Sequence, residues 1–155
     1  MRCFFDTNIL LYQYDASDPL KQSVADTLIK TALVRGGFVI STQVMMEFYN
    51  VACRKYESHF SPTRLSRLMT ELADCEPITL TPQIVVDAVL IHQKQRMSWW
   101  DSTIVSAALH AEADVLYSED LQHGRDFDGL QIVNPFRTAS TVNEPQTPYR
   151  ARRRR

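Results

Sequence analysis

Residues 3–11 read Cys3-Phe4-Phe5-Asp6-Thr7-Asn8-Ile9-Leu10-Leu11, and this stretch indicates the fold. The apolar run predicts a short buried strand over Cys3–Asp6, which ends on an acid. Thr7 and Asn8 are residue types that can cap a helix, and Ile9–Tyr12 is expected to form a helical turn. A strand that passes directly into a helix is the repeating unit of sheets covered by helices.

The same alternation continues along the chain. Serine or threonine precedes proline at Ser61-Pro62 and Thr81-Pro82, a pattern typical of helix starts, and Gly36-Gly37 is expected to end a helix. Alternating strands and helices predict an α/β fold with a mostly parallel sheet covered on both faces. The predicted helices are residues 20–35, 42–56 (capped by Ser41 or Thr42), 62–74, 82–94 and 99–111 (starting at Ser98 or Trp99), and the predicted further strands are 38–40, 78–80, 115–117 and, at the edge of the sheet, 131–133.

Length and composition favour one globular domain. The chain has 155 residues, of which 45% are apolar, enough for one core. No apolar run approaches the roughly 18 residues needed to span a membrane, and no signal peptide is apparent. The cysteines Cys3, Cys53 and Cys75 are scattered, which suits reduced thiols in a cytoplasmic protein.

Charge is distributed unevenly along the chain. Residues 137–155 contain six arginines and one acid, whereas the other 136 residues carry 11 basic and 17 acidic groups. An acidic body is a poor match to a simple DNA-binding module. We therefore predict a folded domain over residues 1–137 and a disordered basic tail over residues 138–155.

Four acids stand in apolar sequence, where an ionised carboxylate is costly without compensation. They are Asp6, Glu47, Asp101 and Asp120. Asp6 and Asp120 come at or just after predicted strand ends, the edge of an open parallel sheet where ligands gather. Carboxylates brought together suit a hard cation, Mg²⁺ or Mn²⁺, and the chain has no HExxH or CxxC pattern that would favour zinc.

Each acid also has an ordinary structural interpretation. Asp6, Asp101 and Asp120 could be helix caps or turn residues. Glu47 could lie on a solvated helix face with Asn50 and Arg54. Three other acids compete or are less favoured: Glu119 could take the role of Asp120, and Asp126 and Asp128 are expected to be loop residues near Gly124 and Gly129.

Four segments together resemble the PIN-domain nucleases, most closely the VapC-like toxin branch. The matching pieces are Phe5-Asp6-Thr7-Asn8-Ile9-Leu10, Ser41-Thr42-Gln43-Val44-Met45-Met46-Glu47-Phe48, Trp100-Asp101-Ser102, and Tyr117-Ser118-Glu119-Asp120-Leu121 with Asn134-Pro135-Phe136. The resemblance covers residues 2–136. It implies a three-layer α/β/α sandwich around four to five strands.

The resemblance also implies a role for each site residue. Asp6, Glu47, Asp101 and Asp120 would bind Mg²⁺ or Mn²⁺, with Asp6 and Asp101 the preferred direct ligands. Asn8 and Ser118 would orient the acids. The implied activity is hydrolysis of RNA phosphodiester bonds, often by a homodimeric toxin that an antitoxin protein holds inactive.

Cations at the rim of the cleft should help RNA to bind beside so many acids. Arg54 and Lys55 are the candidates from sequence. Two alternatives remain open: a catalytically silent PIN-fold subunit that binds RNA or acts as a scaffold, and a metal-dependent hydrolase of a small phosphate substrate.

Overall fold

The computed structural model describes residues 1–56 and 59–137. The predicted tail, residues 138–155, lies outside the described residues. None of the helices in the described segments has the length and apolarity needed to cross a bilayer.

A five-stranded sheet forms the middle layer, with the strand order β2-β1-β3-β5-β4. The first four strands in that order pair in parallel, and β4 pairs antiparallel with β5. The strands are β1 (Cys3–Phe5), β2 (Phe38–Val39), β3 (Val115–Tyr117), β4 (Asp126–Phe127) and β5 (Leu130–Val133).

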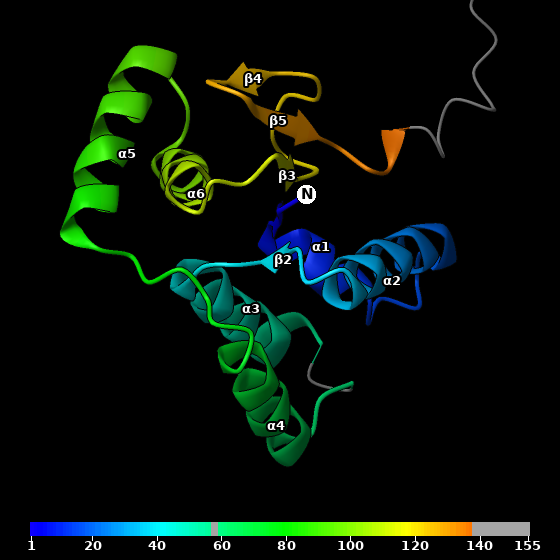
Figure 1. Ribbon diagram of the computed structural model, residues 1–155. Coiled ribbons are helices and arrows are strands. Elements are labelled where there is room, and N and C mark those ends of the chain that lie inside the picture. Colours follow the sequence, from blue (N-terminus) through cyan, green and yellow to red (C-terminus); the bar gives the residue numbers. More distant parts are fainter. Residues whose placement is uncertain (57–58, 138–155) are drawn as a thin grey trace, which may run out of the picture.

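Helices cover the sheet on both sides, which confirms the three-layer α/β prediction. Figure 1 shows α5 and α6 on one side of the sheet and α1 and α2 on the other, with α3 and α4 beyond the β2 edge. The helices are α1 (Thr7–Tyr12), α2 (Pro19–Val34), α3 (Thr42–Lys55), α4 (Pro62–Ala73), α5 (Pro82–Gln95) and α6 (Trp99–His110).

The helix starts follow the predicted capping residues. Ser41, Ser61, Thr81 and Ser98 each accept a hydrogen bond from the backbone N–H three residues later. Such a side-chain acceptor satisfies one of the free N–H groups of the first turn. The first helix differs from the prediction, because Asp6 rather than Thr7 or Asn8 is its cap.

Three neighbouring strands bring aromatic residues together in the core. Phe5 on β1 stacks against Phe38 on β2 and Tyr117 on β3, with ring centroids 5.1 and 5.4 Å apart. Phe5 pairs in register with Tyr117, so the residues that follow them, Asp6 and Ser118, leave the sheet side by side. The core thereby places the first site residues at one edge.

Two predicted strands need correction. Residues 78–80 form a single bridge between Ser41 and Ile78 rather than a strand, because Ser41 is already the cap of α3 and pairing stops there. The strand predicted over 131–133 is not at the sheet edge. Gly129, with φ of +99°, allows a tight hairpin that adds β4 outside β5.

Candidate metal centre

Asp6 is the most buried acid of the candidate site. Its carboxylate accepts hydrogen bonds from the Thr7 backbone N–H at 2.6 Å and from Ser118 Oγ at 2.7 Å, and the residue is 6% exposed. Burial raises the pKa of Asp6 to about 6, with a smaller contribution from the negative charges of Asp120 and Glu47, against the two hydrogen bonds. The cap function and the site function therefore belong to the same carboxylate.

Ser118 connects the end of β1 to the loop that follows β3. Besides donating to Asp6, its hydroxyl oxygen accepts from the backbone N–H groups of Asp120 at 3.2 Å and Leu121 at 3.3 Å. Asn8 Nδ2 donates to Asp120 Oδ2 at 2.6 Å. Asn8 and Ser118 thus each hydrogen-bond to one acid of the candidate site.

Glu47 reaches the site from α3 and is held by two residues that sequence reasoning missed. Thr7 Oγ1 donates to its Oε2 at 2.8 Å, and Gln43 Nε2 donates to its Oε1 at 2.9 Å. Gln43 also donates to the Trp100 carbonyl oxygen at 3.3 Å. The spacing of Gln43 and Glu47, one helical turn apart, was the available signal.

Asp101 approaches from the first turn of α6. Ser98, not Asp101, is the helix cap, so the Asp101 carboxylate is not used for capping. Within the described residues, no hydrogen bond or ion pair holds that carboxylate. Its neighbour Trp100 is 62% exposed and stands at the same pocket, so it does not shield Asp101 from water as a buried indole would.

One pocket of about 260 Å³ brings all four acids together. We call it the acidic pocket; its ten lining residues include no Lys, Arg or His. They are Asp6, Thr7, Asn8, Glu47, Asn50, Val51, Trp100, Asp101, Ile104 and Asp120.

The donor types of the acidic pocket fit a divalent cation, although no three of its acids are gathered around one position. In residues 1–56 and 59–137, no group of three or more His, Cys, Asp or Glu side chains is placed to hold a metal ion. The pocket nevertheless offers oxygen donors of the kind Mg²⁺ and Mn²⁺ prefer. Burial, which raises the pKa of Asp6, makes its ionised form costly, and a bound cation would lower that cost.

Arg54 and Lys55 do not line this pocket. They are exposed at the last turn of α3, and Asn50, one turn closer to Glu47, is the residue of that helix that lines the pocket with it. Their role in RNA binding stays a prediction.

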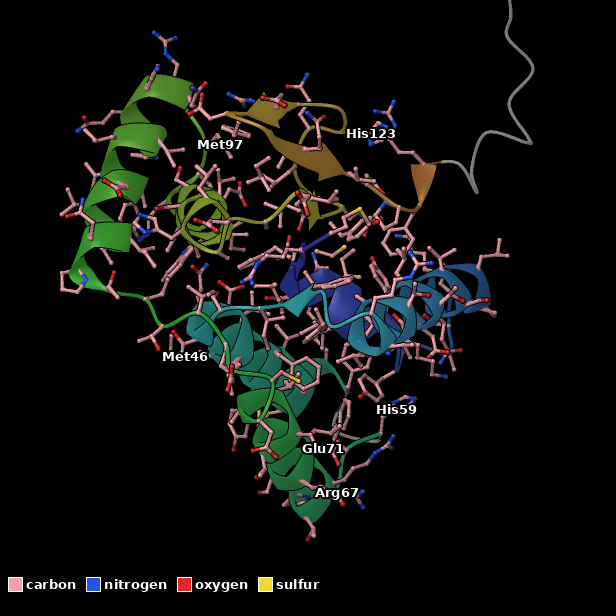
Figure 2. All side chains as sticks on the ribbon, viewed as in Figure 1. Met46, His59, Arg67, Glu71, Met97 and His123 are labelled. Atoms are coloured by element: carbon pink, nitrogen blue, oxygen red, sulfur yellow. The ribbon has the colours of Figure 1, made fainter. Side chains whose placement is uncertain are left out.

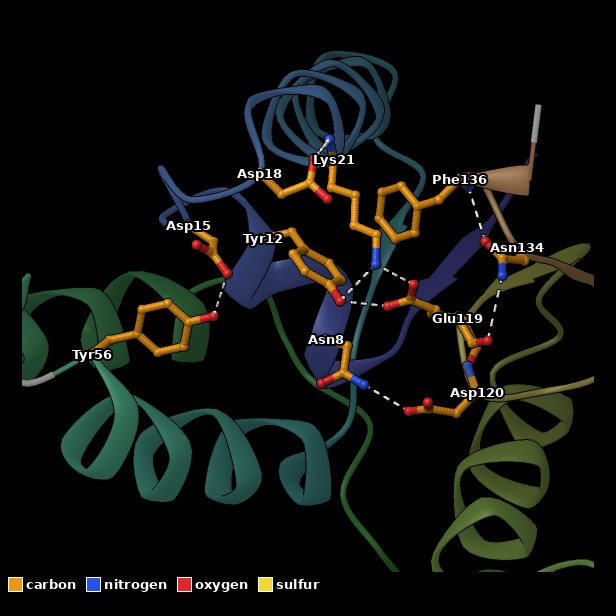
Figure 3. A network of polar contacts seen from close by, with 11 residues as sticks. Asn8, Tyr12, Asp15, Asp18, Lys21, Tyr56, Glu119, Asp120, Asn134 and Phe136 are labelled. Carbon is orange, nitrogen blue, oxygen red and sulfur yellow. Dashed lines mark hydrogen bonds and ion pairs between the residues drawn. The ribbon is translucent and has the colours of Figure 1, made fainter. Parts of the chain in front are cut away.

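A polar network supports the loop that carries Asp120 (Figure 3). We call it the Lys21 network: Lys21 forms an ion pair with Glu119 and donates to the Tyr12 hydroxyl at 3.0 Å, and Tyr12 donates to Glu119 at 2.5 Å. The Lys21 ammonium also lies 4.5 Å from the Tyr12 ring centre. The side chain of Glu119 therefore supports this loop, and Asp120 is the acid of the loop that lines the acidic pocket.

The chain was compared with known proteins. The family model of the PIN domain matches residues 3–126. No curated protein matches the chain. Among solved structures, a chain in the crystal structure of VapBC2 from Rickettsia felis bound to a DNA fragment from their promoter is similar, with 18% identity and a TM-score of 0.57 over 85% of this chain and 97% of that chain.

Proposed function

The chain belongs to the PIN-domain family, and from that membership we propose that it is a Mg²⁺- or Mn²⁺-dependent endoribonuclease. The observation that carries the proposal is the acidic pocket. Four carboxylates from four separate segments of the chain line one cavity, with no cationic side chain among its lining residues. A purely structural role does not account for that arrangement, because gathering like charges raises the free energy of the fold.

The chain's own residues would hold the cation and orient the reaction. Asp6 and Asp101 are the proposed direct ligands, with Glu47 and Asp120 acting through water or at a second ion. A bound divalent cation would supply Lewis acidity toward the scissile phosphate and the attacking water. Ser118 and Thr7 fix the oxygens of Asp6, and Asn8 fixes one oxygen of Asp120.

Exposed Trp100 supports an RNA substrate. Its indole is 62% exposed at the wall of the acidic pocket. An exposed aromatic ring can stack on an unpaired base without reading its identity. A single-stranded segment or loop of RNA therefore suits the site better than a small phosphate ester.

The cleavage assay decides between the nuclease and a silent scaffold. Purified protein should cleave RNA with Mg²⁺ or Mn²⁺ and stop with EDTA. Glu47→Gln and Asp120→Asn should each reduce the rate by more than about tenfold, since removing support around a metal typically costs 10–100-fold. Asp128→Asn, an exposed acid outside the acidic pocket whose left-handed backbone suits asparagine, is the matched control.

Wild type and the Asp6→Asn/Asp101→Asn double variant should differ most. Equal rates for the two would mean that the cleavage comes from a contaminant. RNA binding without any metal-dependent cleavage would favour the silent subunit instead.

The proposal extends to a toxin that an antitoxin protein restrains. It is supported by the family membership together with the fold shared with a chain of the VapBC2 structure. A homodimer is part of the same proposal, and its proposed interface includes Val86 and Leu90 on α5, which are 54% and 60% exposed. A monomer mass by light scattering at high micromolar concentration would exclude the dimer and leave the nuclease proposal untouched.

A further inference from the structure

A second pocket adjoins the acidic pocket and shares two of its acids. It has a volume of about 140 Å³, and Asp101 and Asp120 line both cavities. We call it the adjoining pocket; its other walls include Met97, Gln122 and Arg125. Figure 2 shows Met97 between the end of α5 and β4, so this cavity opens where α5, α6 and the β3–β4 loop meet.

Arg125 is the single cationic residue among those lining the two pockets. In the part of the chain that the structure describes, no carboxylate forms an ion pair with it. Its positive charge is therefore available to a ligand, and Arg125 lines the same small cavity as two of the proposed metal-site acids, Asp101 and Asp120.

The guanidinium of Arg125 is held in place by neutral partners. Its Nη2 donates to Gln95 Oε1 at 2.5 Å, and its central carbon, Cζ, lies 4.5 Å from the centre of the Phe127 ring. The backbone is fixed as well, because Ile132 N–H donates to the Arg125 carbonyl at 2.9 Å. Gln95 uses one of five N–H donors, so the others remain for a bidentate contact with an anion.

We infer that Arg125 binds a backbone phosphate of the RNA next to the phosphate that is cut. A strand lying across the acidic pocket would continue over the shared wall of Asp101 and Asp120 into the adjoining pocket. There a preorganised guanidinium offsets the repulsion between the RNA and the remaining acids. Gln95 is the positioning residue for this contact. The inference rests on the proposed function, since it assumes an RNA strand in the acidic pocket.

Equilibrium binding tests the inference without requiring turnover. The full-length protein carries Glu47→Gln, so that the probe survives, and Glu47 does not line the adjoining pocket. The probe is a fluorescent single-stranded RNA of mixed sequence in Mn²⁺, titrated at several salt concentrations. Arg125→Gln is compared with Arg67→Gln, an exposed arginine that pairs with Glu71 on α4 and lies far from Met97 of the adjoining pocket in Figure 2.

Arg125→Gln should weaken RNA binding about tenfold at low salt and flatten the slope of log K against log salt by about 0.7, the value for one phosphate contact on a single strand. Arg125→Lys should restore most of the salt slope but not the full affinity. Lysine keeps the positive charge but cannot make the two parallel hydrogen bonds of a guanidinium to a phosphate. Gln95→Leu should give a smaller loss of affinity with the slope nearly kept.

Identical affinity and salt slope for Arg125→Gln and Arg67→Gln would overturn the inference. That result would leave the cleavage assay, and so the proposed function, unaffected. Conversely, an absence of cleavage by the wild type would not alter this binding comparison. Thermal unfolding with and without Mn²⁺ shows whether the Arg125→Gln variant is folded and still responds to metal.

Discussion

The acids of the pocket divide into two regions that the protein holds very differently. Where β1 and β3 end, Asp6 is buried and each of its oxygens accepts a hydrogen bond. At the start of α6, Asp101 is half-buried and its carboxylate has no hydrogen-bonding partner among the described residues. The sheet edge offers a fixed anion, whereas α6 offers one that is free to turn toward a ligand. Both are expected to be necessary, but only Asp6 should affect the fold.

Among single substitutions, the largest effect on cleavage should come from Asp101→Asn. Cleavage should fall by at least about 100-fold, because a proposed direct ligand is lost and even outer supports of a metal cost 10–100-fold. The free energy of unfolding in EDTA should change by less than about 1 kcal/mol, the scale of a carboxylate in a helix first turn. Single-turnover cleavage and urea unfolding measure the two quantities. A variant that keeps wild-type cleavage would remove Asp101 from the site.

The pH dependence of stability should separate the two regions. The folded-state pKa of Asp6, about 6, lies above its ordinary value of 3.8, so between these values the folded state binds more protons than the unfolded state. The contribution of Asp6 to stability without metal should therefore be greatest at low pH and fall as pH rises from about 4 to 6, by up to about 3 kcal/mol. Asp6→Asn should remove this component of the slope, and Asp101→Asn should keep it.

Urea unfolding in EDTA at several pH values measures this slope. Equal slopes in Asp6→Asn and wild type would mean that Asp6 does not carry the shifted titration. Saturating Mn²⁺ should raise wild-type stability mainly at the higher pH values, because the metal binds the ionised carboxylate. The fall of stability with pH should therefore become smaller.

Ser118→Ala should weaken the fixed region alone. The hydroxyl accepts from the Asp120 and Leu121 N–H groups and donates to Asp6, so its removal leaves donors without that partner. The free energy of unfolding should fall by about 1–3 kcal/mol, and cleavage by about tenfold or more. Ser23→Ala, exposed on α2, is the matched control. Unchanged stability and cleavage in Ser118→Ala would mean that the two strand ends are oriented by other contacts.

The smallest effect is expected from the Lys21 network. Lys21→Met keeps the aliphatic stem beside the Tyr12 ring and removes the ion pair with Glu119. Stability should fall by about 1 kcal/mol, and cleavage by less than about tenfold, since Asp120 is still held by Asn8. In a double-mutant cycle with Glu119→Gln the losses should not add. Additive losses would show that the two residues act separately.

Local features of the fold were readable from the sequence. The four Ser or Thr caps and the glycines that end α2 act within a few residues, so their effect does not depend on distant parts of the chain. Gly36 is an example: it follows α2 with a φ of +65°, a left-handed backbone conformation that glycine adopts without strain. Two expectations were wrong because they depend on neighbouring segments: residues 78–80 form a single bridge rather than a strand, and the strand over 131–133 is not at the edge of the sheet.

The site was predictable only in part, for the same physical reason. By itself, the sequence determined that four acids in apolar surroundings follow strand ends or lie on helices. Their unusual placement is visible locally, because an acid between apolar neighbours is costly to bury without compensation. Only the tertiary structure determined which residues surround each acid. The strand order places β3 beside β1, and this brings Asn8 to Asp120. It also decided that Thr7 supports Glu47 across 40 residues. Arg125 is held at the adjoining pocket by its hydrogen bond to Gln95, a contact across 30 residues that no local pattern encodes.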